Sequence, residues 1–363
     1  MRIVLFNSER DWGGGEKWYL DSTILLRQHG HEVIPFVHRD GKLKERFQKC
    51  NIPFWDIQIG NLSFLNPFKI HLLSRTFRKL QPDAVLFNLP SDLKAGGIAA
   101  FRAGVSRIVY RRGSAKPIKD SFLNRYLFRK IVTSVIANSY ETRRTILANN
   151  PGLMDPSNIH VVYNGIQSEE YGPAREKSAQ QTFVIGTAGR LSPEKGHSRL
   201  LDVMKILKDK GLGFQLRIAG TGPEEDALKQ KAEKLGLSDC VFFEGFVYAF
   251  SSFLKELDIF VLPSYYEGFG YVLIEAMEAE KPVIAFDTGS SKEIIEEGKN
   301  GFIIPDNNKE AMAHKILLLA KEPGRRREFG KYGRERVEEK FSFDTMYRNL
   351  MQVLTGKISK NEQ

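Results

Sequence analysis

Two glutamates in the second half of the chain stand at a spacing that could serve one ligand. Glu267 and Glu275 lie eight positions apart, and Gly268-Phe269-Gly270 between them opens a predicted helix. Bare amides at a helix start suit phosphate, and carboxylates accept hydrogen bonds from sugar hydroxyls. Together they predict a site for a ligand that carries both groups. Glu275 has a second interpretation, because acids are common in the first turns of helices.

Two cations stand in the loop Gly189–Gly196, directly after a predicted strand. Arg190 and Lys195 at one strand end could neutralise a diphosphate without a metal ion. No Asp-x-Asp pair or histidine cluster with metal-ligand spacing stands nearby, so we expect a metal-independent site. The alternative is two exposed basic residues in a loop.

A third loop, Trp12–Lys17, follows the first predicted strand and contains three consecutive glycines. Gly14 and Gly15 would let the backbone approach a ligand at the start of a helix. The triplet is neither the dinucleotide fingerprint Gly-x-Gly-x-x-Gly nor a Walker A loop. A turn that binds nothing explains it equally well.

These loops are positioned by short apolar runs that alternate with longer amphipathic ones. The pattern predicts parallel sheets covered by helices, with ligands outside the carboxyl ends of the strands. It lapses at 164–181 and then restarts, which predicts two α/β domains joined near residue 170. Helices are expected at 16–29, 93–103, 140–148 and 343–356, and strands at 3–6, 32–37, 84–88, 107–111, 134–138, 182–188, 214–219, 241–244, 259–262, 283–285 and 302–304.

Charge is distributed unevenly along the 363 residues. The chain has 54 basic and 44 acidic residues, and the whole excess of +10 lies in residues 1–170, with 25 basic and 15 acidic. Arg102–Lys130 alone holds nine basic residues and one acid, and the apolar residues of 111–130 have a helical spacing that predicts an apolar stripe. Nucleic acid, an anionic membrane surface and phosphorylated molecules are possible partners, and a solvated basic face or core packing is the alternative.

Cysteine content and apolar runs indicate the compartment. The two cysteines, Cys50 and Cys240, are expected to be buried thiols in a reducing cytoplasm. No apolar run approaches the roughly 20 residues that span a bilayer. Any membrane association would therefore be peripheral, at the inner face of the cell membrane.

The motifs together resemble family 4 glycosyltransferases of the GT-B fold, in particular bacterial transferases of cell-surface polysaccharide and lipopolysaccharide. The resemblance covers essentially the whole chain. It rests on Gly13-Gly14-x-Glu16, on Arg190 with Lys195, on Glu267 and Glu275 around Gly-Phe-Gly, and on Lys281–Ala285 with Glu293–Ile295.

The resemblance implies two Rossmann-like domains whose parallel sheets face across a cleft. Residues 1–170 would bind the acceptor and 171–342 the nucleotide sugar, and 343–363 would return to the first domain. Arg190 and Lys195 would hold the diphosphate, Glu275 the ribose, and Glu267 the transferred sugar. Backbone contacts to the donor would come from Gly14, Gly15, Phe246, Val247, Gly268, Phe269 and Gly270.

Two positions depart from the family pattern, which often has histidines where this chain has Asn88 and Arg112. An arginine stays charged and cannot act as a base, so Arg112 would bind an anionic group, and both residues are candidate acceptor contacts. In the family the departing phosphate is thought to help deprotonate the acceptor. The missing histidine therefore need not abolish activity.

The resemblance thus implies a retaining, metal-independent glycosyltransferase without a cofactor that uses a nucleotide-diphosphate sugar, with a UDP-sugar favoured over GDP- and ADP-sugars. The acceptor would be an anionic glycolipid or glycan, linked to lipid, lipopolysaccharide or capsule. Arg102–Lys130 would meet an anionic membrane surface, and nucleic acid is not expected. A GT-B epimerase or phosphorylase and a basic nucleic-acid-binding protein are the alternatives, although no RNA- or DNA-binding motif supports the last.

Overall fold

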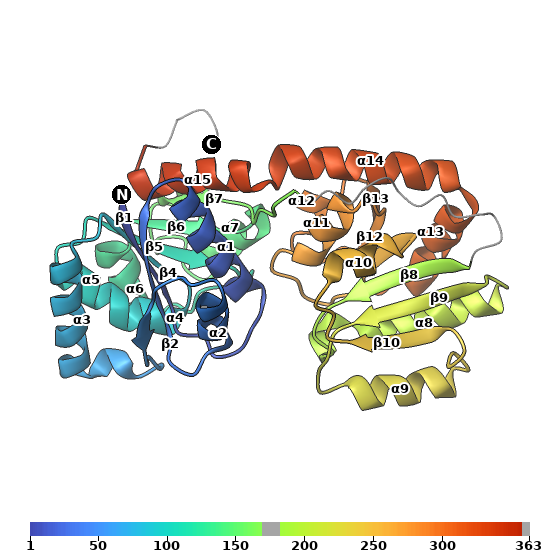
Figure 1. The fold of residues 1–363 in the computed structure, drawn as a ribbon, viewed down its shortest axis with the longest axis horizontal. Coiled ribbons are helices and arrows are strands. Elements are labelled where there is room, and N and C mark those ends of the chain that lie inside the picture. Colours follow the sequence, from blue (N-terminus) through green and yellow to red (C-terminus); the bar gives the residue numbers. More distant parts are fainter. Residues whose placement is uncertain (169–181, 358–363) are drawn as a thin grey trace. The chain divides into compact units, whose positions relative to one another are not determined.

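The computed structural model describes residues 1–168 and 182–357, and these form two compact units (Figure 1). Unit 1 is Met1–Gly165 with Phe343–Gln363, and unit 2 is Ile166–Ser342. The chain passes from one unit to the other between Gly165 and Ile166. The expected boundary at residue 170 lies outside the described residues.

Unit 1 is built on a seven-stranded parallel sheet in the order β3-β2-β1-β4-β5-β6-β7. The reversal of strand order falls between β1 and β4, where ligands bind in such sheets. Its elements are β1 (Arg2–Asn7), α1 (Gly14–Gln28), β2 (Glu32–His38), α2 (Lys42–Lys49), β3 (Trp55–Ile57), η1 (Ser63–Leu65), α3 (Pro67–Leu80), β4 (Ala84–Phe87), α4 (Pro90–Asp92), η2 (Leu93–Gly97), α5 (Ile98–Arg102), β5 (Arg107–Arg112), α6 (Phe122–Tyr126), η3 (Leu127–Ile131), β6 (Ser134–Ala137), α7 (Tyr140–Ile146), η4 (Pro156–Asn158), β7 (Ile159–Val161) and α15 (Phe343–Thr355).

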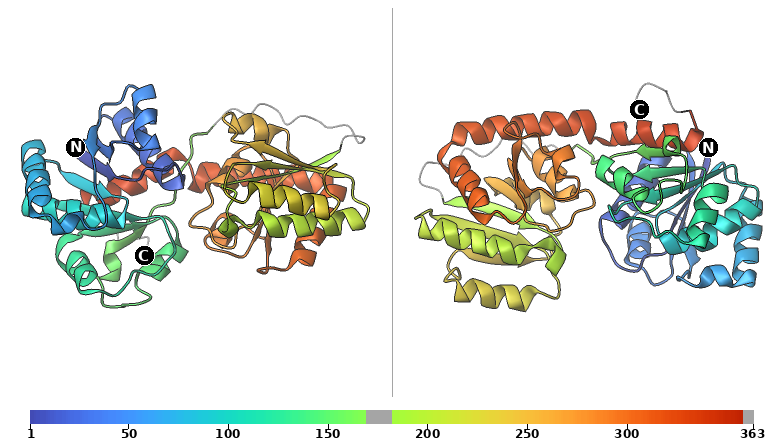
Figure 2. Two further views of the ribbon diagram at one scale, coloured as in Figure 1. Left: turned by 90° about the horizontal axis from the view of Figure 1, so that it is seen from below. Right: turned by 180° about the vertical axis from the view of Figure 1, so that it is seen from behind.

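Unit 2 repeats this architecture with a six-stranded parallel sheet in the order β10-β9-β8-β11-β12-β13 (Figure 2). Here the reversal of strand order falls between β8 and β11. Its elements are β8 (Phe183–Ala188), η5 (Pro193–Lys195), α8 (His197–Asp209), β9 (Phe214–Ala219), α9 (Glu225–Lys234), β10 (Val241–Gly245), α10 (Phe250–Lys255), β11 (Ile259–Leu262), α11 (Tyr271–Glu278), β12 (Val283–Phe286), α12 (Ser291–Ile294), β13 (Gly301–Ile304), α13 (Lys309–Lys321) and α14 (Pro323–Lys340).

The central strands β4, β11 and β12 are apolar along their whole length, as expected where helices cover both faces of a parallel sheet. All four residues of β4, of β11 and of β12 are buried. In unit 1, α3, α5 and η3 pack together over one such core with Ile70, Phe77 and Phe128. The C-terminal helix α15 contacts α1 and β5 of unit 1. The prediction of two parallel-sheet α/β domains is confirmed.

Two sequence expectations need correction. Cys240 is buried as expected, and burial raises the pKa of its thiol. Cys50 is exposed instead, because it stands at the surface end of α2. The stripe expected at 111–130 is helical only from Phe122 onward, in α6 and η3. Among the described residues, no helix is both long and apolar enough to cross a membrane.

Candidate active site

Four loops meet at the carboxyl edge of the unit 2 sheet and are tied together through their backbones. Leu191 N donates to Thr221 O at 3.0 Å, which joins the loop after β8 to the loop after β9. Tyr265 N donates to Glu194 O at 2.9 Å, joining the loop after β8 to that after β11. Thr288 Oγ1 donates to Ser264 O at 3.1 Å, which adds the loop after β12. The loops that carry the predicted residues therefore form one connected surface.

Two glycines allow this close approach. Gly196 has φ +68°, and a Cβ there would lie 2.0 Å from Pro263 O. Gly289 has φ +55°, and a Cβ there would lie 1.9 Å from Glu267 O. Any side chain would push the loop that carries Glu267 away from its neighbours, so both positions require glycine.

Lys195 and Glu267 form an ion pair across these loops. Lys195 Nζ lies 2.8 Å from Glu267 Oε2, and Ser264 Oγ donates to the same oxygen at 3.4 Å. The two side chains are 26% and 14% exposed, so they are held in place but remain reachable from solvent. A ligand carrying both phosphate and hydroxyl groups could contact both charges at once.

The loop before Glu267 is held by a buried arginine that sequence reasoning missed. Arg199 of α8 is 1% exposed, and it donates through Nε to Pro263 O at 2.6 Å and through a second nitrogen to Ser264 O. Its guanidinium stacks on Tyr265 and Phe286 with 3.9 and 3.8 Å to the ring centroids. No spacing in the sequence marks this residue, because its partners, two backbone carbonyls and the Asp306 carboxylate, are 64, 65 and 107 positions away.

A buried histidine follows the Lys195 loop. His197 is the first residue of α8 and is 1% exposed. Burial, with a smaller effect of Lys195, lowers its pKa to about 4, so the ring is neutral at pH 7. It packs behind the Lys195 loop as an uncharged ring.

The helix after Glu267 begins as predicted. Gly270 precedes α11 in the left-handed conformation (φ +88°), and Glu275 is the fifth residue of that helix. Phe269 is 3% exposed, and its ring contacts Tyr271 and Phe341, so only its backbone is available to a ligand.

The remaining donor-site candidates lie on neighbouring loops. Arg190 is exposed at the start of the loop that ends in Lys195. Phe246 and Val247 directly follow β10, where Phe246 is 49% exposed and packs edge-on against Tyr248.

In unit 1 the structure brings Gly15 and Asn88 together but places Arg112 elsewhere. A Cβ on Gly15 would lie 3.2 Å from Asn88 Nδ2, and Gly14 is the first residue of α1. Arg112 donates to Lys116 O at 2.8 Å and to the Tyr110 hydroxyl at 3.4 Å. Part of its hydrogen-bonding capacity is therefore used within its own loop.

The adjacent Arg111, not singled out by sequence reasoning, is the buried cation of this region. It is 2% exposed and donates to Asn88 Oδ1 at 2.9 Å and to Asn164 Oδ1 at 3.0 Å. Its guanidinium also stacks over Trp18 at 4.2 Å. Arg111 therefore fixes the orientation of Asn88. The strand pattern could have found it, since it ends a predicted strand.

Two buried carboxyl groups, Glu16 of α1 and Asp92 of α4, contact residues at the end of β1. Burial raises the pKa of Glu16, whose Oε1 accepts from Asn7 Nδ2 at 3.1 Å. Burial also raises the pKa of Asp92 to about 7, although hydrogen bonds from the Ser8 backbone and hydroxyl oppose this. Asp92 thus changes charge near neutral pH.

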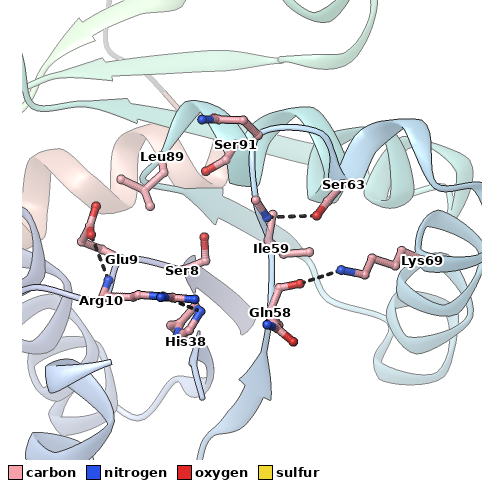
Figure 3. Close-up of a pocket in the computed structure, with 12 residues that line it drawn as sticks. Ser8, Glu9, Arg10, His38, Gln58, Ile59, Ser63, Lys69, Leu89 and Ser91 are labelled. Atoms are coloured by element: carbon pink, nitrogen blue, oxygen red, sulfur yellow. Dashed lines mark hydrogen bonds between the residues drawn. The ribbon is translucent and has the colours of Figure 1, made fainter. Parts of the chain in front are cut away.

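An open pocket of about 560 Å³ lies at the carboxyl ends of β1, β2 and β3 (Figure 3). Arg10, His38 and Lys69 are among its polar lining residues, with Ile59 and Leu89 as apolar ones. Arg10 Nε donates to His38 Nε2 at 3.3 Å, and burial and Arg10 lower the pKa of His38. The pocket presents mainly neutral polar and cationic groups, with Glu9 as an acid on its wall.

Most of the basic stretch Arg102–Lys130 is engaged within unit 1. Arg125 forms two hydrogen bonds with Asp120, Arg129 donates twice to Gly152 O, and Arg107 donates to Thr355 O. Ile118, Leu127 and Phe128 of the apolar stripe are buried, whereas Phe122 is 87% exposed. The exposed basic residues of the stretch are Arg102, Lys116, Lys119, Arg125, Arg129 and Lys130.

Among residues 1–168 and 182–357, no group of three or more histidine, cysteine, aspartate or glutamate side chains is arranged to hold a metal ion.

Comparison with known proteins matches residues 12–336 to two glycosyltransferase family models. Residues 12–170 match the model "Glycosyltransferase Family 4", and residues 170–336 match "Glycosyl transferases group 1". The capsular polysaccharide biosynthesis glycosyltransferase CapM of Staphylococcus aureus is 30% identical over 308 residues, covering 79% of this chain and 80% of CapM. A poly(ribitol-phosphate) alpha-N-acetylglucosaminyltransferase of the same species is 28% identical, and there the match spans 47% of the relative.

Solved structures agree on the fold. Anabaena Alr3699/HepE, crystallised with UDP, has a TM-score of 0.85 and 23% identity, covering 98% of this chain and 100% of that one. A glycosyltransferase from Rickettsia africae has a TM-score of 0.87 and 21% identity, covering 99% of both chains. The chain therefore has the GT-B fold and belongs to glycosyltransferase family 4.

Proposed function

We propose that this glycosyltransferase moves a sugar from a nucleotide-diphosphate sugar, with a UDP-sugar as the favoured donor, to a lipid-linked or other cell-envelope glycan. The observation that carries the proposal is the Lys195–Glu267 pair on a surface of interlocked loops. HepE, the structural relative, binds UDP. CapM, the relative in sequence, belongs to capsule synthesis.

The donor would lie along the carboxyl edge of the unit 2 sheet. Lys195 and Arg190 would neutralise the diphosphate, and the amides of Gly268–Gly270 would donate to phosphate and sugar. Glu267 would accept a hydroxyl of the transferred sugar, and Glu275 the ribose hydroxyls. Phe246 and Val247 would meet the base through their backbone, and Gly14 and Gly15 would approach the phosphate from unit 1.

Catalysis would come from positioning and from stabilising the departing diphosphate. As the bond from the anomeric carbon to the phosphate oxygen breaks, negative charge grows on that oxygen, where Lys195 and Arg190 act. The acceptor oxygen bonds to the same face of the sugar, and its proton passes to the departing phosphate. The proposed reaction is therefore retaining and needs neither a metal ion nor a cofactor.

The acceptor would bind unit 1, where Asn88 and Arg112 stand near the ends of β4 and β5. An anionic glycolipid or glycan suits the excess of basic residues in residues 1–170. We also propose that the enzyme works in the cytoplasm at the inner face of the membrane, with exposed bases of Arg102–Lys130 near its surface and without nucleic acid as a partner.

A panel of nucleotide sugars tests the proposal directly. The enzyme is first screened by thermal shift with UDP-, GDP- and ADP-sugars, and the best binder is used for transfer to membrane lipid extracts. We expect stabilisation by a UDP-sugar and a product whose anomeric configuration matches the donor by NMR, in EDTA as in magnesium. An inverted product would contradict the retaining mechanism, and activity lost in EDTA would contradict metal independence.

A further inference from the structure

One segment of unit 1 exposes a row of large apolar side chains. They lie in η1 and α3 and in the loop before them, and their exposed fractions are 72% for Leu62, 66% for Leu65, 74% for Phe68 and 55% for Leu72. Adjacent exposed apolar residues on one face indicate an interaction surface more often than scattered ones do.

The row continues into basic residues along the same side of α3. Phe68, Leu72, Arg75 and Lys79 follow one another at intervals of four, three and four residues, which keeps them on one helix face. We call Leu62, Leu65, Phe68, Leu72, Arg75 and Lys79 the docking face.

The fold fixes this face outward. Ile70, Ser74 and Phe77 lie on the opposite side of α3 and are buried, where the helix packs against α5. Asn66 caps the helix by accepting from Lys69 N at 3.1 Å, and Pro67 occupies the first turn. The helix cannot turn the docking face inward without exposing its own core residues.

The charge of the segment identifies the partner. Residues 57–82 contain four basic residues, Lys69, Arg75, Arg78 and Lys79, and no aspartate or glutamate. Exposed apolar side chains flanked by cations without acids are complementary to an anionic lipid bilayer, where apolar groups enter the headgroup region and cations meet lipid phosphates.

We propose that the docking face binds an anionic lipid bilayer. The same segment forms a wall of the unit 1 pocket through Ile59, Gly60, Asn61, Ser63 and Lys69 (Figure 3). Docking would therefore hold the pocket at headgroup depth, where it can receive the polar, phosphate-bearing part of a lipid-linked acceptor. This last consequence rests on the proposed function, whereas bilayer binding does not.

Vesicle co-sedimentation tests the proposal with the full chain. The wild type is expected to bind vesicles of phosphatidylcholine with phosphatidylglycerol. The double variant Phe68→Asp/Leu72→Asp should bind at least about tenfold more weakly. It loses two apolar side chains that would be buried in the bilayer, and it adds two negative charges. Both positions are exposed and outside the pocket, so far-UV circular dichroism should be unchanged.

Phe122→Asp tests the other candidate contact, because Phe122 is an 87% exposed aromatic residue of Arg102–Lys130, the stretch proposed above to lie near the membrane. It should weaken binding less than the double variant does. If Phe122→Asp abolishes binding while the double variant binds normally, the bilayer is met by Arg102–Lys130, and the assignment to the docking face is overturned. No binding of the wild type overturns it as well.

Two further measurements test the role of charge in bilayer binding and distinguish bilayer binding from donor binding. Arg75→Gln/Lys79→Gln should weaken binding to anionic vesicles by roughly 25-fold, about fivefold for each charge, and should bind pure phosphatidylcholine as the wild type does. Equal affinity of the wild type for both lipid compositions would contradict the role of charge. Thermal stabilisation by UDP should be the same in all variants, and its absence in the wild type would count against the proposed donor and not against bilayer binding.

Discussion

At the scale of single residues, the proposed chemistry depends on a lysine and a glutamate held 2.8 Å apart. Their positions are set by groups that never touch a ligand. Arg199 anchors the loop that carries Glu267, and Gly196 lets the loop with Lys195 approach Pro263. The pair is thus preorganised, which is what electrostatic stabilisation of a leaving group requires.

The first prediction concerns the charge of Lys195. Lys195→Ala should lower kcat/KM for transfer by at least about 100-fold, because the cation that faces the departing phosphate is lost. Steady-state assays of nucleotide release measure this effect. Lys205→Ala is the control, since Lys205 pairs with Asp209 on the surface of unit 2. Wild-type turnover in Lys195→Ala would contradict the assigned role.

The second prediction follows from the raised pKa of Asp92. Its pKa is about 7 in the folded protein and 3.8 as an ordinary aspartate, so between these values the folded state holds a proton that the unfolded state lacks. Stability contributed by Asp92 is therefore present at pH 4 and is lost as pH rises to 7, by up to about 4 kcal/mol.

Asp92→Asn should remove this slope, because asparagine mimics the protonated carboxyl at all pH values. Tryptophan fluorescence in urea at several pH values reports on unit 1 specifically, since Trp12, Trp18 and Trp55 all belong to it. Asp40→Asn, at an exposed aspartate of the same unit, should keep the wild-type slope. A slope in Asp92→Asn equal to that of the wild type would contradict the account.

At the scale of elements, the two ends of α8 provide a matched pair of glycines. Both have positive φ, +68° at Gly196 and +77° at Gly211, but only a Cβ on Gly196 meets another atom, Pro263 O at 2.0 Å. Gly211→Ala should lower the free energy of unfolding by about 1 kcal/mol, from the left-handed backbone alone. Gly196→Ala should lower it by about 2 kcal/mol more, because its Cβ would displace the loop. Urea unfolding followed by circular dichroism measures both, and equal costs would contradict the close approach.

Much of the element order was predictable, and the exceptions have physical causes. Long apolar strands such as β1 and β8 stand out in the sequence because both their faces are covered. The edge strands β3 and β7 have three residues each and were not predicted, since so short a run shows no periodicity. The rule that loops follow strands placed Arg190, Lys195 and Glu267 at one edge of the unit 2 sheet.

Long-range contacts set the limit of that prediction. Arg199 and Arg111 are buried cations whose partners lie far along the chain: two carbonyls and the Asp306 carboxylate for Arg199, and amide oxygens for Arg111. In the sequence Arg199 looks like any surface arginine on a helix, whereas Arg111 is marked only by its place at the end of a predicted strand. The burial of His197 and the internal pairing of Arg125 likewise depend on neighbours that only the folded chain brings together.

At the scale of the whole molecule, the proposed function gives the two units different tasks, and this leads to a prediction about ligand-linked stability. UDP should raise the unfolding transition of unit 2, by about 2.7 kcal/mol at 100 times its dissociation constant. Calorimetry and circular dichroism should show this shift. Tryptophan fluorescence, which reports on unit 1, should show a smaller shift of the unfolding transition. A shift seen only by fluorescence would place the donor on unit 1 and contradict the prediction.

Charge is divided between the units in keeping with these tasks. The excess of basic residues lies in residues 1–170, and the remaining residues are neutral overall. Within unit 1 many of these bases bind carbonyls and carboxylates of their own unit. The segment 57–82, which has no acid, offers the better-defined contact with an anionic surface.

The central claim is that a nucleotide sugar reacts at the Lys195–Glu267 site, and Glu267→Gln tests it most directly. Sugar transfer from the best-binding nucleotide sugar to membrane lipid extract is measured for the wild type and the variant, with thermal shift by UDP measured in parallel. We predict that Glu267→Gln keeps its UDP stabilisation and loses at least about 100-fold in transfer rate. Wild-type transfer by Glu267→Gln, or no transfer by the wild type from any nucleotide sugar, would contradict the claim.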